Sequence, residues 1–363
     1  MRFLPLAAAL LATAVAAFGS LTGAGAAPDA RDRAVPHYDH VIVIVEENKG
    51  YRTIMERNLA PNIVRLAKEY GTATRMYGEV HPSEGNYVAL LGGDTFGIRD
   101  DDAWYCASGS TRAFCSHAND PGYPAHLIDA PNLGTQLRAK GLDWRAYLED
   151  IPEDGSLAII SAGTATRPPA LYAAKHTGFT NFKSTVEDPQ RAQRLVGFEA
   201  WQRDLRAGKL PAFSLVVPNQ CNEMHGIGAG AGNAVPADCS DANGAISRGD
   251  RVAGELVAAI QASPVWKSGN TAIVITWDED GGEDRGAGGP ESCCVTDAHN
   301  PGGGHIPTVV ITNHGPRGVS DDTPYDHYSL LRTIEDAFGL DHVRHAADDA
   351  VAPMARLFGP VSR

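Results

Sequence analysis

The chain lacks features that mark several common classes of protein. Its 31 Lys and Arg residues stand against 44 Asp and Glu, a formal net charge of -13, so it has no basic excess for binding a nucleic acid. Beyond residue 18, no apolar run is long enough to span a bilayer. None of the six cysteines forms a Cys-x-x-Cys pair, which disfavours a zinc site made of thiolates. We expect no nucleic-acid partner and no stable membrane anchor.

The first residues have the pattern of an export signal. Arg2 precedes an apolar run over 3–18, and the small residues at 24–26 form a plausible cleavage signal. The sequence therefore predicts a secreted protein, with a signal peptide over 1–27 that is cut near Ala26 or Ala27 and a single domain over 28–363. A retained membrane anchor is the alternative, but the apolar run is short for a spanning helix.

An even number of cysteines in an exported chain predicts disulfides. Closure of short loops favours Cys106 with Cys115 and Cys221 with Cys239. This leaves the adjacent Cys293 and Cys294, whose direct bridge would be strained. The first two bridges would pin the long Gly- and Asp-rich loops over 94–124 and 226–244, and such loops usually shape a binding site.

Helical and strand patterns alternate along the chain. Helices are expected at 60–70, 86–91, 132–140, 248–262 and 327–338, and strands at 41–45, 144–147, 212–217, 272–277 and 308–311. Alternation of this kind predicts an α/β fold with a mostly parallel central sheet and helices on both faces.

Two of the predicted strands run directly into acidic and amide side chains. The apolar run after Tyr38 ends in Glu46-Glu47-Asn48, and the run after Thr271 ends in Asp278-Glu279-Asp280. Continuous β-branched runs suit the inner strands of a parallel sheet, and open α/β sheets bind ligands at the carboxyl ends of their strands. Two core strands followed by polar loops would give the same pattern, so the two runs need support from other motifs.

A serine at the start of a short helix is the first such motif. Ser83, in His81-Pro82-Ser83-Glu84-Gly85-Asn86-Tyr87, precedes a helical pattern that ends at Gly92-Gly93. Its hydroxyl could simply cap the helix. The same position suits a nucleophile that attacks phosphorus, because helix amides favour a bound phosphate. His81, two residues earlier, could act on a proton or on the phosphate.

Three further histidines lie beside predicted strands or helices. His225 follows Glu223 after the 212–217 strand, His305 follows three glycines, and His327 opens the last long helix after Asp326, a possible cap. Glu and neutral His are ordinary ligands for a divalent cation, and a His can also donate to a phosphoryl oxygen. Solvated loop residues would look the same.

Together these motifs resemble the phosphoesterase family of bacterial acid phosphatases and phospholipases C, within the alkaline-phosphatase-like superfamily. Glu-Asn, His-Pro-Ser-x-x-Asn-Tyr, acidic-x-His, Trp-Asp-Glu and Gly-Gly-His occur in the family's order, followed by His-Tyr-Ser-Leu-Leu. The resemblance covers nearly the whole chain after the signal. The 83–93 stretch also looks like the nucleophile helix of sulfatases, but a serine there argues against formylglycine chemistry.

The resemblance implies roles for particular residues. Ser83 would attack phosphorus to form a phosphoseryl enzyme, helped by one divalent cation. The metal ligands would be Glu47, Asn48, Ser83, Asp278 and Glu279. The phosphoryl group and its protons would be served by four histidines, His81, His225, His305 and His327. The substrate would also contact Asn86 and Glu223. Many relatives carry Asp where this chain has Glu223, so that residue could bind metal, orient His225 or do neither. Which two of Asp278, Glu279 and Asp280 point inward stays open.

The resulting expectation is a secreted, acid-phosphatase-like phosphomonoesterase acting on a small phosphate ester. Its oxygen-rich ligand set favours Ca²⁺, Mg²⁺ or Mn²⁺ over Zn²⁺. A phospholipase C that cleaves phospholipid head groups is the close alternative. An exported binding protein that has lost catalysis is a third. The sequence does not fix the oligomeric state.

Overall fold

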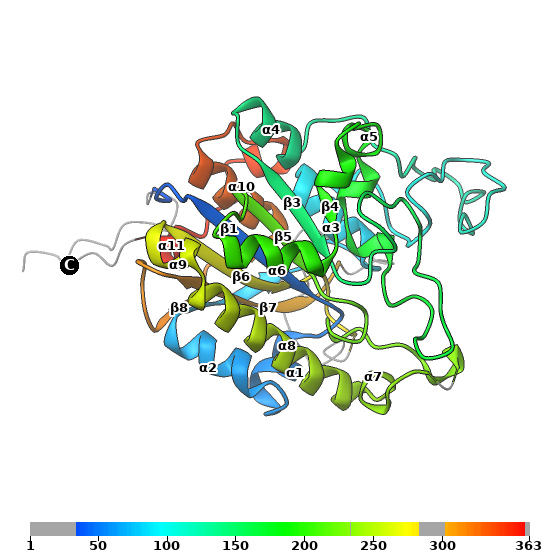
Figure 1. Cartoon of the computed structure of the whole chain (residues 1–363). Coiled ribbons are helices and arrows are strands. Elements are labelled where there is room, and N and C mark those ends of the chain that lie inside the picture. Colours follow the sequence, from blue (N-terminus) through cyan, green and yellow to red (C-terminus); the bar gives the residue numbers. More distant parts are fainter. Residues whose placement is uncertain (1–33, 233, 283–301, 360–363) are drawn as a thin grey trace, which may run out of the picture.

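A nine-stranded sheet forms the centre of the fold (Figure 1). The computed structural model describes residues 34–232, 234–282 and 302–359, so the predicted signal peptide and Cys293 and Cys294 lie outside the described residues. The strand order is β4-β3-β5-β1-β6-β7-β2-β8, with β9 paired to β2. The strands are β1 (His40–Glu46), β2 (Gly71–Tyr77), β3 (Trp144–Leu148), β4 (Leu195–Val196), β5 (Phe213–Val217), β6 (Thr271–Trp277), β7 (His305–Thr312), β8 (Val319–Asp321) and β9 (Tyr325–Asp326).

The sheet is mostly parallel, as predicted. Among the described strands, only β7 runs antiparallel to its neighbours, β6 and β2. Strands β1 and β6 lie at the centre and have almost no solvent exposure along their length, which explains their unbroken apolar sequences. In their register Glu46 pairs with Trp277, so the next residues, Glu47 and Asp278, leave the sheet side by side.

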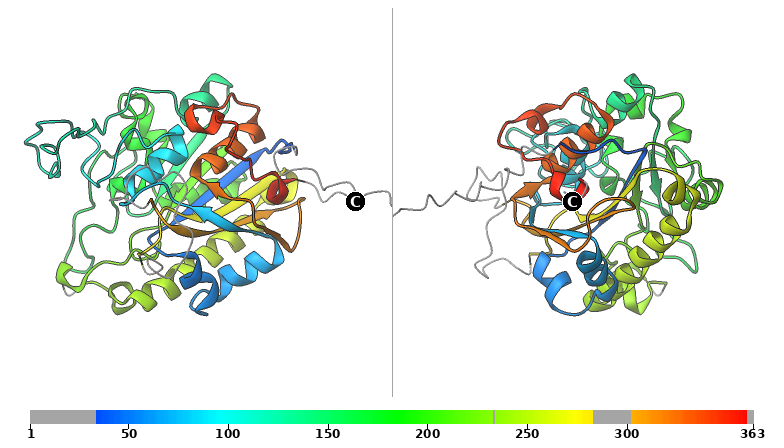
Figure 2. Two further views of the ribbon diagram at one scale, coloured as in Figure 1. Left: turned by 180° about the vertical axis from the view of Figure 1, so that it is seen from behind. Right: turned by 90° about the vertical axis from the view of Figure 1, so that its left-hand side faces the viewer.

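Helices cover both faces of the sheet (Figure 2). One face carries α1 (Tyr51–Glu56), α2 (Pro61–Glu69), α6 (Phe198–Ala207), α8 (Ala242–Ala262) and α9 (Pro264–Ser268), and the other carries α3 (Glu84–Gly92), α4 (Leu133–Ala139) and α10 (His327–Phe338). Asp326 caps α10 by accepting from the Ser329 amide at 2.7 Å. Shorter helices are α5 (Lys183–Val186), α7 (Ala237–Ser240), α11 (Ala355–Phe358) and the 3₁₀ turns η2 (Ala174–His176), η3 (Phe179–Asn181), η4 (Arg191–Gln193), η5 (Ala229–Ala231) and η6 (Arg344–Ala347).

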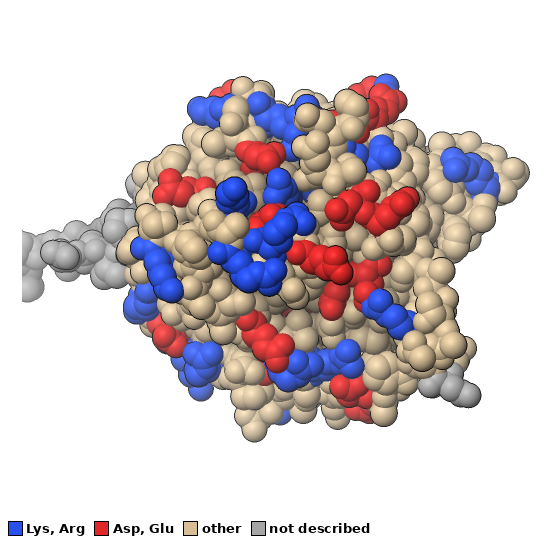
Figure 3. Space-filling view, viewed as in Figure 1, with Lys and Arg blue, Asp and Glu red and all other residues tan. Residues whose placement is uncertain are grey.

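Long connections gather beyond the carboxyl ends of the parallel strands, at the right of Figure 1. Two disulfides pin them, Cys106 to Cys115 and Cys221 to Cys239, with Cα separations of 5.5 and 4.8 Å. Both bridges were predicted from loop closure and are confirmed. Within the described residues, no helix combines the length and the apolar character needed to cross a bilayer. Basic side chains on the face in Figure 3 lie in small groups among acidic and uncharged ones.

Candidate active site

The side chains that follow β1 and β6 meet at one point. The Asn48 backbone amide donates to Asp278 Oδ1 at 3.0 Å, which ties the two strand ends together. Asn48 lies in the left-handed region, with φ of 50°, a conformation that asparagine tolerates better than most residues. This turn aims its side-chain amide at the acids of both strands.

One end of the Asn48 amide faces three carboxylates and the Ser83 hydroxyl. It lies 3.1 Å from Glu47 Oε2, 3.3 Å from Asp278 Oδ2 and 3.1 Å from Glu279 Oε1. If this end is the NH₂ group, it donates to all three. If it is the oxygen, it joins the carboxylates in an oxygen cluster of the kind that Ca²⁺, Mg²⁺ and Mn²⁺ prefer.

Ser83 faces the same cluster. It occupies the N-cap position of α3, but its side chain makes no capping hydrogen bond. Instead its hydroxyl donates to Glu47 Oε2 at 3.1 Å and lies 3.4 Å from Asn48 Oδ1. The helix-cap interpretation of Ser83 therefore fails, because Asp101 Oδ1 accepts from the first helical amide, that of Glu84, at 3.2 Å.

The cluster brings acidic groups together in a buried place. Burial raises the pKa of Glu47 well above its ordinary value, and Asp278 and Glu223 raise it further. Burial followed by the charge of Asp278 raises the pKa of Glu279 to about 10. Burial also raises the pKa of Asp278. Carboxylates in such surroundings are stabilised in their ionised form by a cation, so the set fits a divalent metal ion.

His81 stands between two acids of the β6 end. Its Nδ1 lies 2.5 Å from Glu279 Oε2, and its Nε2 lies 3.5 Å from Asp280 Oδ1. Asp280 also accepts from the Gly282 amide at 2.8 Å. Thus Asp278 and Glu279 face Asn48, while Asp280 turns toward His81 and its own loop, which answers the question left open by the sequence.

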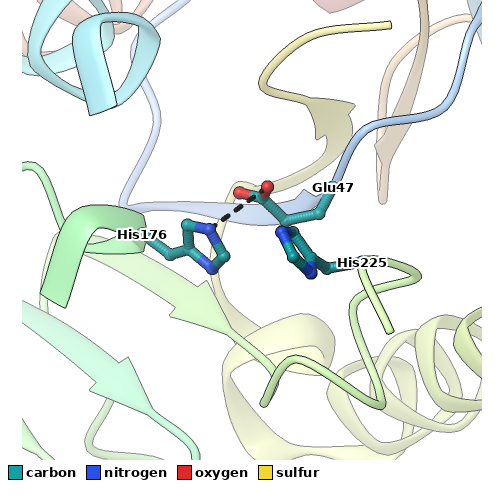
Figure 4. Close-up of side chains that lie close together, drawn as sticks. All are labelled: Glu47, His176 and His225. Atoms are coloured by element: carbon teal, nitrogen blue, oxygen red, sulfur yellow. Dashed lines mark ion pairs between the residues drawn. The ribbon is translucent and has the colours of Figure 1, made fainter. Parts of the chain in front are cut away.

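A pair of histidines lies beside Glu47 (Figure 4). His176 Nε2 is 3.3 Å from Glu47 Oε2, and His176 Nδ1 is 2.8 Å from Glu223 Oε1. Glu223 thus contacts His176 and not His225. Ligand atoms of Glu47, His176 and His225 all lie within 4.8 Å of one another.

Both histidines of the pair are held neutral. Burial, followed by the charge of Lys175, lowers the pKa of His225 to about 4 and that of His176 well below its ordinary value. His225 Nδ1 lies 2.7 Å from the Gly226 carbonyl oxygen, so a neutral ring carries its proton there. Its Nε2 is then a proton acceptor.

Two predicted site residues, Asn86 and His327, hold the backbone around the site through hydrogen bonds. Asn86 was expected to contact substrate, but its Oδ1 accepts from the amides of Glu79 and Val80 at 2.8 and 3.0 Å, and its Nδ2 donates to the Val80 carbonyl at 2.8 Å. It therefore holds the turn that leads to Ser83. His327 is buried, with Nδ1 2.5 Å from Glu79 Oε2 and Nε2 2.9 Å from the Trp277 carbonyl oxygen, so it secures the end of β6.

His305 contacts the neighbouring strand and helix. Its Nε2 lies 2.9 Å from the Thr74 carbonyl oxygen, and its ring stacks on Tyr51 at a centroid distance of 4.5 Å. These contacts tie it to β2 and to the start of α1. Its predicted contact with a phosphoryl group stays a prediction.

The buried His327–Glu79 pair predicts a pH-dependent stability. Burial alone would lower the pKa of His327, but Glu79 outweighs it and raises the pKa to about 9. A raised folded-state pKa contributes stability that is full below the unfolded value of about 6.5 and is lost as pH rises through about 9. His327→Gln should lower the free energy of unfolding by about 3 kcal/mol at pH 6, since it strands a buried carboxylate.

The measurement is thermal unfolding of both proteins from pH 6 to 9.5. The wild-type advantage should shrink as the pH rises. His342→Gln is the control, because His342 pairs with Asp336 at a partly exposed site and such pairs contribute little. A constant gap between wild type and His327→Gln at every pH would show that the ion pair is not the cause.

Sequence reasoning missed three residues of the site. Tyr87 donates from its hydroxyl to Glu47 Oε1 at 2.5 Å, and Lys175 pairs with Asp101 at 2.7 Å. Charges of Asp101, Glu47 and Asp278 raise the pKa of Lys175 against the opposing effect of burial. Lys175 and the third residue, His176, lie on η2 within a long connection that has no strand or helix pattern to mark it. Tyr87 did lie inside the quoted serine motif, one turn along the helix.

Comparison with solved structures defines the class of fold. A protein of the alkaline phosphatase superfamily from Vibrio parahaemolyticus matches with a TM-score of 0.52 at 15% identity, covering 88% of this chain and 73% of that one. The PsFucS1 sulfatase of a Pseudoalteromonas species matches with a TM-score of 0.51 at 13% identity, covering 89% and 72%. The predicted alkaline-phosphatase-like fold is confirmed.

The sequence matches the Phosphoesterase family over residues 53–341, and the chain belongs to that family. It is 30% identical over 355 residues to a phosphatidylinositol-3-phosphatase of Mycobacterium tuberculosis, covering 98% of this chain and 92% of that protein. It is 26% identical to an acid phosphatase of Aspergillus fumigatus, covering 77% of this chain and 51% of that protein, so it spans about half the length of this relative. The chain is a hydrolase of phosphoric esters.

Proposed function

We propose that the protein is a metal-assisted phosphomonoesterase in which Ser83 is the nucleophile. The observation that carries this proposal is the Ser83 hydroxyl, which bonds Glu47 Oε2 and not a helix amide. A serine turned into buried carboxylates at a helix start has little structural purpose there. It is well placed to attack a phosphoryl group that a cation holds against it.

A divalent cation would be held by Glu47, Asn48, Asp278 and Glu279 beside Ser83. When bound, it would neutralise phosphoryl charge and lower the pKa of the serine hydroxyl. The oxygen-dominated donors favour Ca²⁺, Mg²⁺ or Mn²⁺. We favour a single ion held by these acids, which leaves the histidines beside Glu47 to act on the phosphate and its protons.

The chain's own residues supply the proton steps. In the first step the Ser83 oxygen bonds phosphorus, the ester bond breaks, and the serine proton leaves along its hydrogen bond to Glu47. The departing alcohol takes a proton from His81, whose ring lies beside Glu279 and Asp280. In the second step water attacks the phosphoserine and gives its proton to His225 Nε2, the bond between phosphorus and the Ser83 oxygen breaks, and that oxygen takes its proton back from Glu47 as phosphate leaves. Exchange with solvent then removes the proton from His225 and returns one to His81.

Lys175 and His176 lie next to the proposed catalytic residues. Lys175 carries a positive charge that acts on both Glu47 and Asp278, so it can offset the charge of a bound phosphate. Glu223 orients His176 through its 2.8 Å contact. Asn86 and His327 position the Ser83 turn and the β6 end.

We also propose that the protein is exported after removal of residues 1–27. The two disulfides support this proposal, because such bridges persist in oxidising compartments. Its substrate would be a small phosphate monoester outside the cytoplasm.

The discriminating experiment compares substrates under matched conditions of pH and metal. Purified protein should release phosphate from 4-nitrophenyl phosphate and show no head-group release from phosphatidylcholine or phosphatidylinositol. Cleavage of the lipid diesters without monoester cleavage would establish phospholipase C activity instead. Ligand binding without turnover of any ester would favour a binding protein.

A further inference from the structure

A cavity of about 220 Å³ is lined in part by residues that adjoin the proposed phosphoryl site in the sequence. Glu84, the neighbour of Ser83, and Lys175, the neighbour of His176, both line it. Asp101 joins these two walls, since its carboxylate accepts from the Glu84 amide and pairs with Lys175. The cavity lining therefore includes the sequence neighbours of Ser83 and His176, and Asp101 links them.

The outer part of the cavity is apolar. Its walls include Trp104, Phe114, Ile159 and Ile160. Phe114 is 53% exposed and Ile160 is 39% exposed, and they are the two exposed large apolar side chains in the described part of the chain. Exposed apolar groups gathered at one cavity mark a binding surface more often than chance exposure does.

The loop that carries Phe114 is held rigidly in this exposed position. Phe114 lies in the left-handed region, with φ of 59°, which costs energy in a bulky residue. The next residue, Cys115, is bridged to Cys106, and the Phe114 carbonyl accepts from the Ala103 amide at 2.8 Å. In Figure 1 this loop, near residue 110 on the colour bar, projects from the right of the molecule.

The wall formed by Ile159 and Ile160 is joined to the η2 turn, which carries Lys175 and His176. Ile160 forms a β-bridge with Ala173, and the Ala174 amide donates to the Ile159 carbonyl at 2.8 Å. This short pairing leads directly into Lys175 and His176. The apolar wall and the residues that face Glu47 are therefore joined by direct backbone contacts.

We propose that this cavity binds the apolar organic part of the substrate, an aromatic or alkyl group joined to the phosphate that Ser83 attacks. The inference rests on the proposed function for the position of the phosphate. Lys175, which lines the cavity and whose charge acts on Glu47 and Asp278, complements the phosphate charge, and the apolar lining complements the group attached to it. The enzyme should therefore hydrolyse phosphate esters of apolar groups with a higher kcat/KM than esters of polar groups.

The test measures selectivity, defined as kcat/KM for 1-naphthyl phosphate divided by kcat/KM for glycerol 2-phosphate. The double variant Phe114→Ser, Ile160→Ser should lower this ratio about tenfold relative to wild type, because it removes apolar contact with the naphthyl ring alone. Phe198→Ser is the matched control. Phe198 lines a different cavity, between α6 and α8, so this variant should keep the wild-type ratio.

The outcomes separate this inference from the proposed function. An unchanged ratio in the double variant, with both esters still hydrolysed, would overturn the cavity assignment and leave the phosphatase intact. If wild type hydrolyses neither ester, binding of 1-naphthylmethylphosphonate is compared with that of methylphosphonate by calorimetry. Equal affinities, or a naphthyl preference that survives in the double variant, would overturn the inference. If the double variant bound phosphatidylcholine vesicles more weakly than wild type but kept the same selectivity ratio, Phe114 and Ile160 would contact a membrane and not the substrate.

Discussion

Replacing Ser83 with alanine should abolish phosphate-ester hydrolysis while leaving the fold intact. Loss of a covalent nucleophile typically costs on the order of 10⁴-fold or more in kcat. The structural effect should be small, within about 1 kcal/mol, because the hydroxyl makes one hydrogen bond to a carboxylate and no helix cap. Hydrolysis of 4-nitrophenyl phosphate and thermal unfolding of the same preparations measure the two effects.

Ser240→Ala provides the matched control for this variant. Ser240 is an exposed serine on α7 whose hydroxyl bonds the Ala237 carbonyl, and its replacement should leave kcat within about twofold of wild type, as surface changes usually do. If Ser83→Ala also retains activity near that of wild type, another group attacks phosphorus. The proposed mechanism would then be wrong.

Removing divalent cations should inactivate the protein and lower its melting temperature. The cluster of Glu47, Asp278 and Glu279 is buried, and the pKa values of all three are raised, so a cation that binds only the folded state stabilises it. At a concentration 100 times its dissociation constant, such an ion adds about 2.7 kcal/mol, or about 5 °C in a protein of this size. Chelation followed by return of single cations, with unfolding and activity measured together, tests this.

The variant Asp278→Asn tests whether the cation binds at Asp278, because the amide mimics a protonated acid. Its melting temperature in chelator should match that of chelated wild type, yet added cation should neither raise it nor restore activity. Asp129→Asn is the control, since the Asp129 side chain is 80% exposed and its loss should leave the metal response unchanged. A full metal response in Asp278→Asn would place the ion elsewhere.

The centre of the fold was predictable because its signals are local and physical. The runs that form β1 and β6 are apolar and β-branched without interruption, which only burial on both faces explains. Parallel pairing then brings Glu47 and Asp278 together. Strand β2 was missed because Thr72, Thr74 and Arg75 interrupt its apolar pattern, and its neighbours β7 and β8 define it instead.

The candidate site was predictable only where a motif adjoins a strand or helix end. Ser83 and the acids meet that condition. His176 does not, because the pairing of Ile160 with Ala173 brings it to Glu47 from a long connection. Asn86 and His327 lie in recognisable motifs, but sequence cannot tell a side chain that faces substrate from one that holds the backbone behind it.

The most direct test of the central claim follows the configuration at phosphorus. A phosphate monoester made chiral with oxygen isotopes is incubated with enzyme and an alcohol acceptor, and the configuration of the transferred phosphoryl group is determined. Two successive in-line displacements through phospho-Ser83 predict overall retention. Inversion would mean that the acceptor attacks phosphorus directly, and it would contradict the account of Ser83 as the nucleophile.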